Sequence, residues 1–243
     1  MSRPRPAPDA SPNAAETAEA HYRRMCRLGE MSAAQLARAL ADEPGPWIET
    51  AARYGVAEAQ VRLGQLRLED GRSEEALCWF ERAAAKGSAE AMNMLGRAAE
   101  LGWAGPADDA AAARWYRRAA EAGDPWGQYN YANLLFDGRG VPRDEAQALA
   151  WYRLAAGQGH ARAMNLLGRC AEEGWGGAAD MAAARDWYRR SAEGGYFRGA
   201  YNHAACLAAD GRLDEARAWL DAALEEAPND QRPALLAALR DGR

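Results

Sequence analysis

The sequence is poor in the residues from which catalytic and metal sites are usually built. Its 243 residues include three histidines and four cysteines, and no two cysteines form a C-x-x-C pair. The motifs G-x-S-x-G, H-E-x-x-H and the phosphate-binding P-loop are all missing. We therefore expect no catalytic residues, no bound metal and no cofactor. Cys170 and Cys206 are expected to be small buried apolar residues.

A strongly basic surface and a long apolar run are also missing. The net charge of −5 argues against a nucleic-acid-binding protein, which needs a basic face. The chain has no run of about 18 apolar residues, so we expect no membrane insertion. Residues 1–14 are rich in Pro, Ala and Ser without the apolar centre of a signal peptide, which predicts a disordered tail and a cytoplasmic location.

What the sequence does contain is one motif at a fixed spacing. Two residues after an aromatic pair come two small residues, and after two more residues comes glycine, as in the stretch from Trp115 to Gly123. The tryptophans of this motif recur every 36 residues, at Trp79, Trp115, Trp151 and Trp187. A period in the range of about 20–50 residues is typical of stacked repeats that bury their apolar faces against neighbours. The sequence therefore predicts an all-α protein, an α/α superhelical solenoid of stacked helical hairpins.

The repeat motif also predicts the division of the chain. Trp47 to Gly55 is a weak copy of the motif, as expected for the terminal repeat of a solenoid, one face of which meets water. The repeats at 88–123 and 160–195 share 24 of 36 positions, which suggests that a two-repeat module was duplicated. After the tail we expect a helical cap with a degenerate repeat at 15–55, repeats at 56–87, 88–123, 124–159, 160–195 and 196–227, and a C-terminal capping helix at 228–243.

Each repeat is expected to contain an A helix, a loop and a B helix. The apolar positions of the A helix follow the spacing of one buried face, and Gly96 marks a close approach between helices. The Trp-Tyr pair of the B helix is expected to lie in the core. One aspartate lies seven residues before each of three tryptophans, where it would cap the B helix rather than bind a metal. These are Asp108, Asp144 and Asp180.

At this point the chain resembles the Sel1-like repeat family, relatives of the tetratricopeptide repeats. The third repeat carries the resemblance most fully, through its Gly-x-Gly-Val loop, the aspartate before the B helix, the Trp-Tyr pair, Ala-Ala and the final glycine. These residues are Gly138 to Val141, Asp144, Trp151, Tyr152, Ala155, Ala156 and Gly159. The resemblance implies an α/α superhelix that acts as a scaffold for protein complexes, usually without catalysis.

A second stripe on each A helix is a candidate binding surface. By analogy with tetratricopeptide repeats, we expect these stripes to line a concave groove that binds a protein or peptide partner. Aromatic residues and arginine dominate binding hot spots, and the third repeat supplies most of the aromatic ones. The alternative is that these rings pack against neighbouring helices. The candidate residues are Asn93, Arg97, Trp126, Tyr129, Asn133, Phe136, Arg162, Asn165, Arg169 and Tyr201.

These patterns predict a non-enzymatic adaptor that binds its partner along the A helices. A regulatory protein that binds a small molecule or a cell-wall fragment in the same groove is the alternative. A homo-oligomer formed through the aromatic stripe is a third possibility.

Overall fold

The computed structural model of the chain describes residues 32, 44–233 and 236–237. The expected tail at 1–14, nearly all of the cap before residue 44 and much of the C-terminal capping helix lie outside these residues. In the described part the chain forms eleven α-helices and no strand, so the predicted all-α solenoid is confirmed. The chain divides into two compact units, the first ending at Ala91 and the second beginning at Met92.

The first unit contains the degenerate repeat and the first clear hairpin. Its helices are α3 (Pro44–Tyr54), α4 (Ala57–Glu69) and α5 (Ser73–Ala84). The Pro-Gly-Pro segment at 44–46 forms the first turn of α3. Proline is tolerated there because the first N–H groups of a helix have no intrahelical partner.

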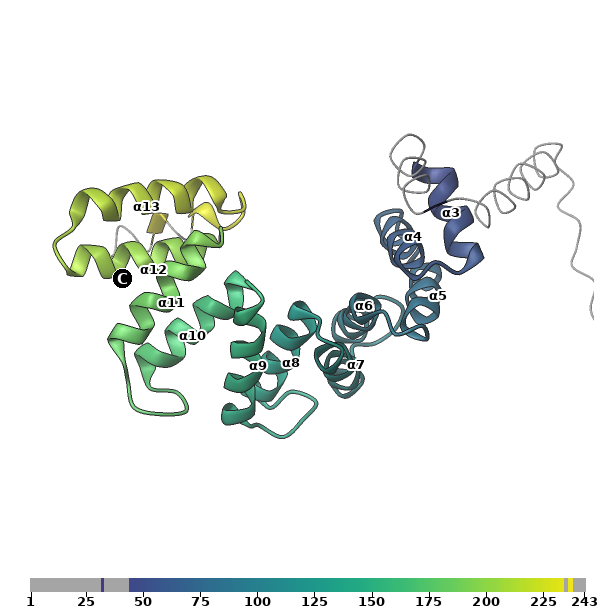
Figure 1. Cartoon of the computed structure of the whole chain (residues 1–243), viewed down its shortest axis with the longest axis horizontal. Helices are drawn as coiled ribbons and strands as arrows, with labels where there is room; N and C mark the ends of the chain where they lie inside the picture. Colours follow the sequence, from purple (N-terminus) through teal and green to yellow (C-terminus); the bar gives the residue numbers. More distant parts are fainter. Residues whose placement is uncertain (1–31, 33–43, 234–235, 238–243) are drawn as a thin grey trace, which may run out of the picture. The chain divides into compact units, whose positions relative to one another are not determined.

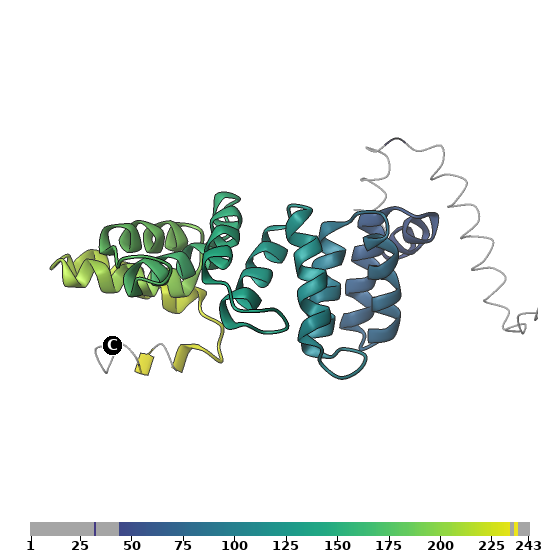
Figure 2. The same ribbon diagram turned by 90° about the horizontal axis from the view of Figure 1, so that it is seen from below.

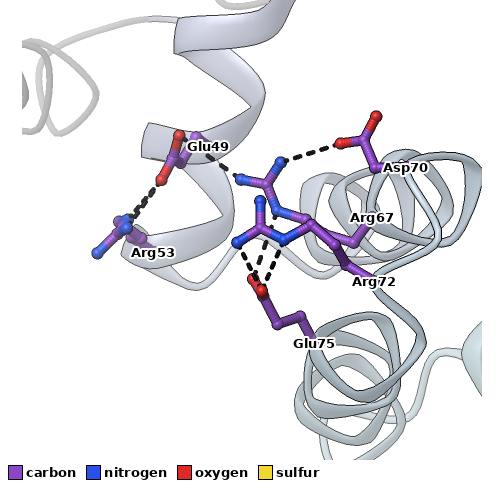
Figure 3. Close-up of polar contacts among 6 residues, drawn as sticks. All are labelled: Glu49, Arg53, Arg67, Asp70, Arg72 and Glu75. Carbon is purple, nitrogen blue, oxygen red and sulfur yellow. Dashed lines mark hydrogen bonds and ion pairs between the residues drawn. The ribbon is translucent and has the colours of Figure 1, made fainter. Parts of the chain in front are cut away.

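Charged side chains tie the three helices of the first unit together (Figure 3). The Arg67 guanidinium of α4 forms ion pairs with Glu49 of α3 at 4.0 Å, with Asp70 at 3.7 Å and with Glu75 of α5 at 3.7 Å. Its side chain is only 21% exposed, which reduces screening by solvent. One arginine thus links three consecutive helices, which is a structural role.

The second unit is a row of helical hairpins. From α7 to α13, consecutive helices pack against one another (Figures 1 and 2). Helix α6 begins at the end of the first unit and continues into the second. The A helices are α6 (Ala89–Leu101), α8 (Pro125–Asp137), α10 (Ala161–Glu173) and α12 (Phe197–Ala209); the B helices are α7 (Asp109–Glu121), α9 (Glu145–Gly157), α11 (Met181–Glu193) and α13 (Leu213–Glu226).

The repeated aromatic pair is buried unequally. Tyr116 is 1% exposed, and its ring lies where a Cβ on Gly96 would stand only 2.4 Å away, so the expected close approach is confirmed. Trp115, one helical step further round, is half-buried, and the Arg118 guanidinium lies 4.5 Å from its ring centre. The prediction of a core pair therefore holds fully for the tyrosine and only partly for the tryptophan.

Two smaller expectations are confirmed in the second unit. The Asp108, Asp144 and Asp180 carboxylates each accept a hydrogen bond from a backbone N–H in the first turn of their B helix, at 2.8–3.0 Å. Cys170 and Cys206 are buried and free. Burial raises the pKa of the Cys170 thiol to about 11, which keeps it protonated and unreactive at neutral pH.

The core tyrosines donate hydrogen bonds across their hairpins, and these bonds should differ in strength. The Tyr116 hydroxyl donates to the Glu100 carboxylate at 2.7 Å, whereas the Tyr152 hydroxyl donates to the Asn133 amide oxygen at 2.6 Å. Hydrogen bonds to charged groups contribute more than neutral ones. We expect Tyr116→Phe to lower the free energy of unfolding by about 2 kcal/mol and Tyr152→Phe by about 1 kcal/mol, measured by urea denaturation. Equal costs would contradict this ranking.

The loop between α8 and α9 is fixed to the preceding repeat. The Arg139 guanidinium donates to Glu100 at 3.0 Å and to Asp109 at 2.7 Å, at opposite ends of the α6–α7 loop. The next residue, Gly140, has φ +66° and lies against the Asp109 carbonyl. The Gly-x-Gly-Val loop therefore connects the third repeat to the second.

Candidate functional site

The candidate residues of the A helices fall into three groups by exposure. Arg97, Trp126, Arg162 and Arg169 are exposed, and Trp126 exposes 44% of its surface. Four others are half-buried, and two are buried. We call the exposed and half-buried members the A-helix surface; it consists of Arg97, Trp126, Tyr129, Asn133, Phe136, Arg162, Arg169 and Tyr201.

Asn93 and Asn165, expected to line the candidate binding surface, are buried instead. They are 6% and 5% exposed, and each accepts a hydrogen bond from the side-chain amide of an asparagine 37 residues later, Asn130 or Asn202, at 2.9 or 2.8 Å. A buried amide needs a hydrogen-bonding partner, and the next repeat supplies it. These two asparagines therefore link neighbouring repeats. Asn133 is similarly engaged by the Tyr152 hydroxyl.

The sequence left open whether the aromatic residues of α8 line a binding surface or pack against neighbouring helices, and in the structure they pack and stay partly exposed. The Tyr129 ring lies 4.8 Å from the His160 ring, and the Phe136 ring lies 5.1 Å from that of Trp175, which belongs to the α10–α11 loop of the next repeat. Both rings pack against the core and remain half-exposed. Tyr201 likewise packs against the core formed around α13. These rings thus support the fold and still contribute apolar area to the A-helix surface.

The three arginines of this surface stack on aromatic rings. Arg97 lies 5.6 Å from the ring centre of Trp103, and Arg169 lies 5.3 Å from that of Trp175. Arg162 contacts two rings, Trp126 at 5.2 Å and Tyr196 at 5.6 Å. Within the described residues none of the three forms an ion pair with a carboxylate. Their positive charge is therefore available to a partner.

A hollow of about 430 Å³ opens beside Arg162. It is lined by the first turns of α8 and α10 and by the chain segments that lead into α10 and α12. Trp126 and Arg162 were among the residues proposed from the sequence, whereas His160 and Tyr196 were missed. A signal did exist, because both occupy the N-cap position that recurs every 36 residues. Among the residues of this lining, Arg162 carries a permanent charge and His160 is the residue whose charge depends on pH near neutrality.

His160 is the least exposed polar residue of the lining, at 8%. Its Nδ1 accepts a hydrogen bond from the Ala163 backbone N–H at 3.2 Å, which places the proton of the neutral ring on Nε2. The Nε2 atom is buried without a hydrogen-bonding partner. The centres of the His160 and Trp126 rings lie 4.4 Å apart, with the ring planes at 86°. Burial, assisted by the Arg162 charge, lowers the pKa of His160 to about 4. The ring is therefore neutral at physiological pH.

The described part of the chain contains neither a cluster of metal-binding side chains nor a membrane-spanning helix. Within residues 32, 44–233 and 236–237, no three His, Cys, Asp or Glu side chains gather closely enough to hold a metal ion. No described helix has the length and apolar character needed to cross a membrane.

The Sel1 repeat family matches four stretches of the chain, more than half of its length: 57–88, 89–124, 127–160 and 161–196. A Sel1 repeat protein from Oxalobacter formigenes is 30% identical, with a TM-score of 0.65 over 73% of this chain and 74% of that one. A protective antigen of uropathogenic Escherichia coli strains, with the same type of repeat fold, is also 30% identical, with a TM-score of 0.64. That match covers 80% of this chain but only 44% of the antigen.

A more distant likeness extends further along the chain. An immunity protein from Pseudomonas aeruginosa has a TM-score of 0.53 and 18% identity over 90% of this chain and 84% of its own, which is a likeness of fold alone. No curated protein matches the sequence.

Proposed function

The chain belongs to the Sel1 repeat family, and we propose that it is a non-catalytic scaffold whose A-helix surface binds a protein or peptide partner. The single observation that carries this proposal is the set of three arginines, Arg97, Arg162 and Arg169, held against aromatic rings without an ion pair in the described structure. A cytoplasmic location stays a prediction from the sequence.

Arginine and aromatic side chains are the residues most often found at binding hot spots. They combine apolar area with directed hydrogen-bond donors. Stacking orders the long arginine side chain before binding, which reduces the entropy lost when a partner docks. Four consecutive A helices carry these groups at matching positions, so an extended partner could contact several repeats at once.

Reversing two of these charges tests the proposal. In the variant Arg97→Glu/Arg169→Glu we expect recovery of the captured partner from a lysate of the source cells to fall at least tenfold, measured by quantitative mass spectrometry. Lys86 is the only lysine of the chain, so amine coupling at low labelling leaves the A-helix surface unmodified. Since both arginines are exposed, the melting temperature should change by about 2–4 °C at most.

The matched control is Arg114→Glu/Arg153→Glu, on the B helices α7 and α9. These arginines are also exposed and form no ion pair within the described part of the chain, so the net charge changes by the same amount. The control should recover the partner as well as the unchanged protein does. Equal recovery by all three proteins, or recovery of no partner by any, would refute the proposal. Light scattering of the purified protein distinguishes a partner that is a second copy of the chain.

A further inference from the structure

We propose that the hollow beside Arg162 receives an aspartate or glutamate side chain from an acidic segment of the partner. This inference rests on the proposed function and adds the chemistry of the partner to it. In the proposed complex the carboxylate oxygens accept hydrogen bonds from the Arg162 guanidinium, and the apolar part of the segment lies against Trp126 and Tyr196.

The charge of the hollow favours an anion. No aspartate or glutamate lines it, and Arg162 has no carboxylate partner among the described residues. His160 remains neutral at physiological pH because of its burial. The local positive charge is therefore that of one guanidinium, which an incoming carboxylate would neutralise.

The geometry of Arg162 favours a carboxylate in particular. Trp126 belongs to the repeat before Arg162, and Tyr196 begins the repeat after it; both rings lie within 5.6 Å of the guanidinium carbon. Contacts of this kind orient the planar group and leave its N–H edge for hydrogen bonding. A guanidinium edge presents two parallel donors that match the two oxygens of a carboxylate.

The surroundings of Arg162 provide room and a favourable field. Gly159 and Gly195 contribute backbone without side chains to the lining, and a Cβ on either would meet open space. Tyr196 forms no side-chain cap on α12, so the N–H groups of the first turn of that helix add a weak positive potential. The hollow has room for one or two side chains, which suits a peptide segment.

The arrangement does not recur one repeat earlier in the chain. The positions that match Trp126, Arg162 and Tyr196 are occupied there by Glu90, Trp126 and His160. In the earlier repeat a glutamate occupies the position of Trp126 and a tryptophan occupies the position of Arg162, so that repeat has no cation at this place. We therefore expect the preference for a carboxylate to belong to this hollow and not to every repeat.

Selection from a library tests the inference without knowledge of the partner. The full-length protein, Arg162→Gln and Arg118→Gln would each be coupled as bait for a phage-displayed random dodecapeptide library. We expect the unchanged protein and Arg118→Gln to enrich peptides that carry Asp or Glu beside an apolar residue. Arg162→Gln should lose at least tenfold of that acidic enrichment. Arg118 is the matched control because it is also exposed and also stacked on a tryptophan, but it lies on the B helix α7, outside the A-helix surface.

A synthetic peptide from the selection then completes a mutant cycle. Exchanging its acidic residue for the amide should weaken binding to the unchanged protein at least tenfold and leave binding to Arg162→Gln unaltered. Three results would each overturn the inference. The enriched peptides could lack an acidic preference, the amide exchange could weaken binding to Arg162→Gln as much as binding to the unchanged protein, or no peptide could be enriched over an uncoated surface. Peptides that bind independently of Arg162 but are lost in Arg97→Glu/Arg169→Glu would leave the scaffold function standing.

Discussion

Gly140→Ala is expected to lower the free energy of unfolding by about 3 kcal/mol. Two costs add at this position. The backbone has φ +66°, where a residue with a Cβ is strained by about 1 kcal/mol or more. The new Cβ would also stand 2.1 Å from the Asp109 carbonyl oxygen and 2.7 Å from the Ala110 nitrogen. Both atoms belong to the backbone at the start of α7, so no side chain can rotate to relieve the contact.

The expected structural consequence is separation of the loop from the preceding repeat. Movement of residue 140 would draw Arg139 away from Glu100 and Asp109, which it now joins. Hydrogen exchange should therefore increase in the α8–α9 loop and at the start of α7 together, because their contact is shared. Thermal unfolding should begin about 6–12 °C lower for a loss of this size.

Two further glycine variants separate strain from the backbone collision. Gly123 has φ +92° with open space around it, so Gly123→Ala should show strain alone and cost about 1 kcal/mol. Gly177 has neither a positive φ nor a neighbour within 4 Å, and Gly177→Ala should be neutral or slightly stabilising. If Gly140→Ala costs no more than Gly123→Ala, the loop is not held against α7 in the way described.

The fold could be predicted because repetition makes each sequence signal redundant. The 36-residue spacing fixes which positions become neighbours, and the small residue facing each core tyrosine or phenylalanine fixes how closely the helices approach. Gly96 with Tyr116 and Gly168 with Tyr188 follow one rule, as does Gly64 with Phe80. Local rules also sufficed for the aspartate caps, because capping depends on three or four residues.

The site could be predicted only in part, because it depends on differences between repeats. Asn93 and Asn165 look like surface residues on a helical projection, and their burial comes from an asparagine in the next repeat. The recurrence of two asparagine pairs at a spacing of 37 was a signal for this bond. The hollow beside Arg162 combines residues from three repeats, and the distances between its rings follow from packing that no single repeat determines.

Acid should destabilise this protein through His160. In the unfolded chain the imidazole takes a proton near pH 6.5, whereas in the folded protein burial and the Arg162 charge lower the pKa to about 4. Between these values the unfolded state binds more protons, so stability is complete above pH 6.5 and is lost as the pH falls toward 4. The shift corresponds to about 3 kcal/mol over this window. Below pH 4 both states are protonated and this contribution changes no further.

Comparison with His160→Ser separates the contribution of the imidazole to the pH dependence of stability from the contributions of other titratable groups. Serine occupies the same N-cap position at Ser88, where its hydroxyl accepts a hydrogen bond from the Ala91 N–H, so the cap is retained. At pH 7 the variant should be less stable by about 1–2 kcal/mol, since the contacts with Trp126 and Tyr129 are lost. Titration of Asp124, whose pKa is raised by burial, is common to both proteins and cancels in the difference. The stability gap, measured by urea denaturation from pH 7 to pH 4, should therefore close or reverse; a constant gap would show that His160 is not held neutral.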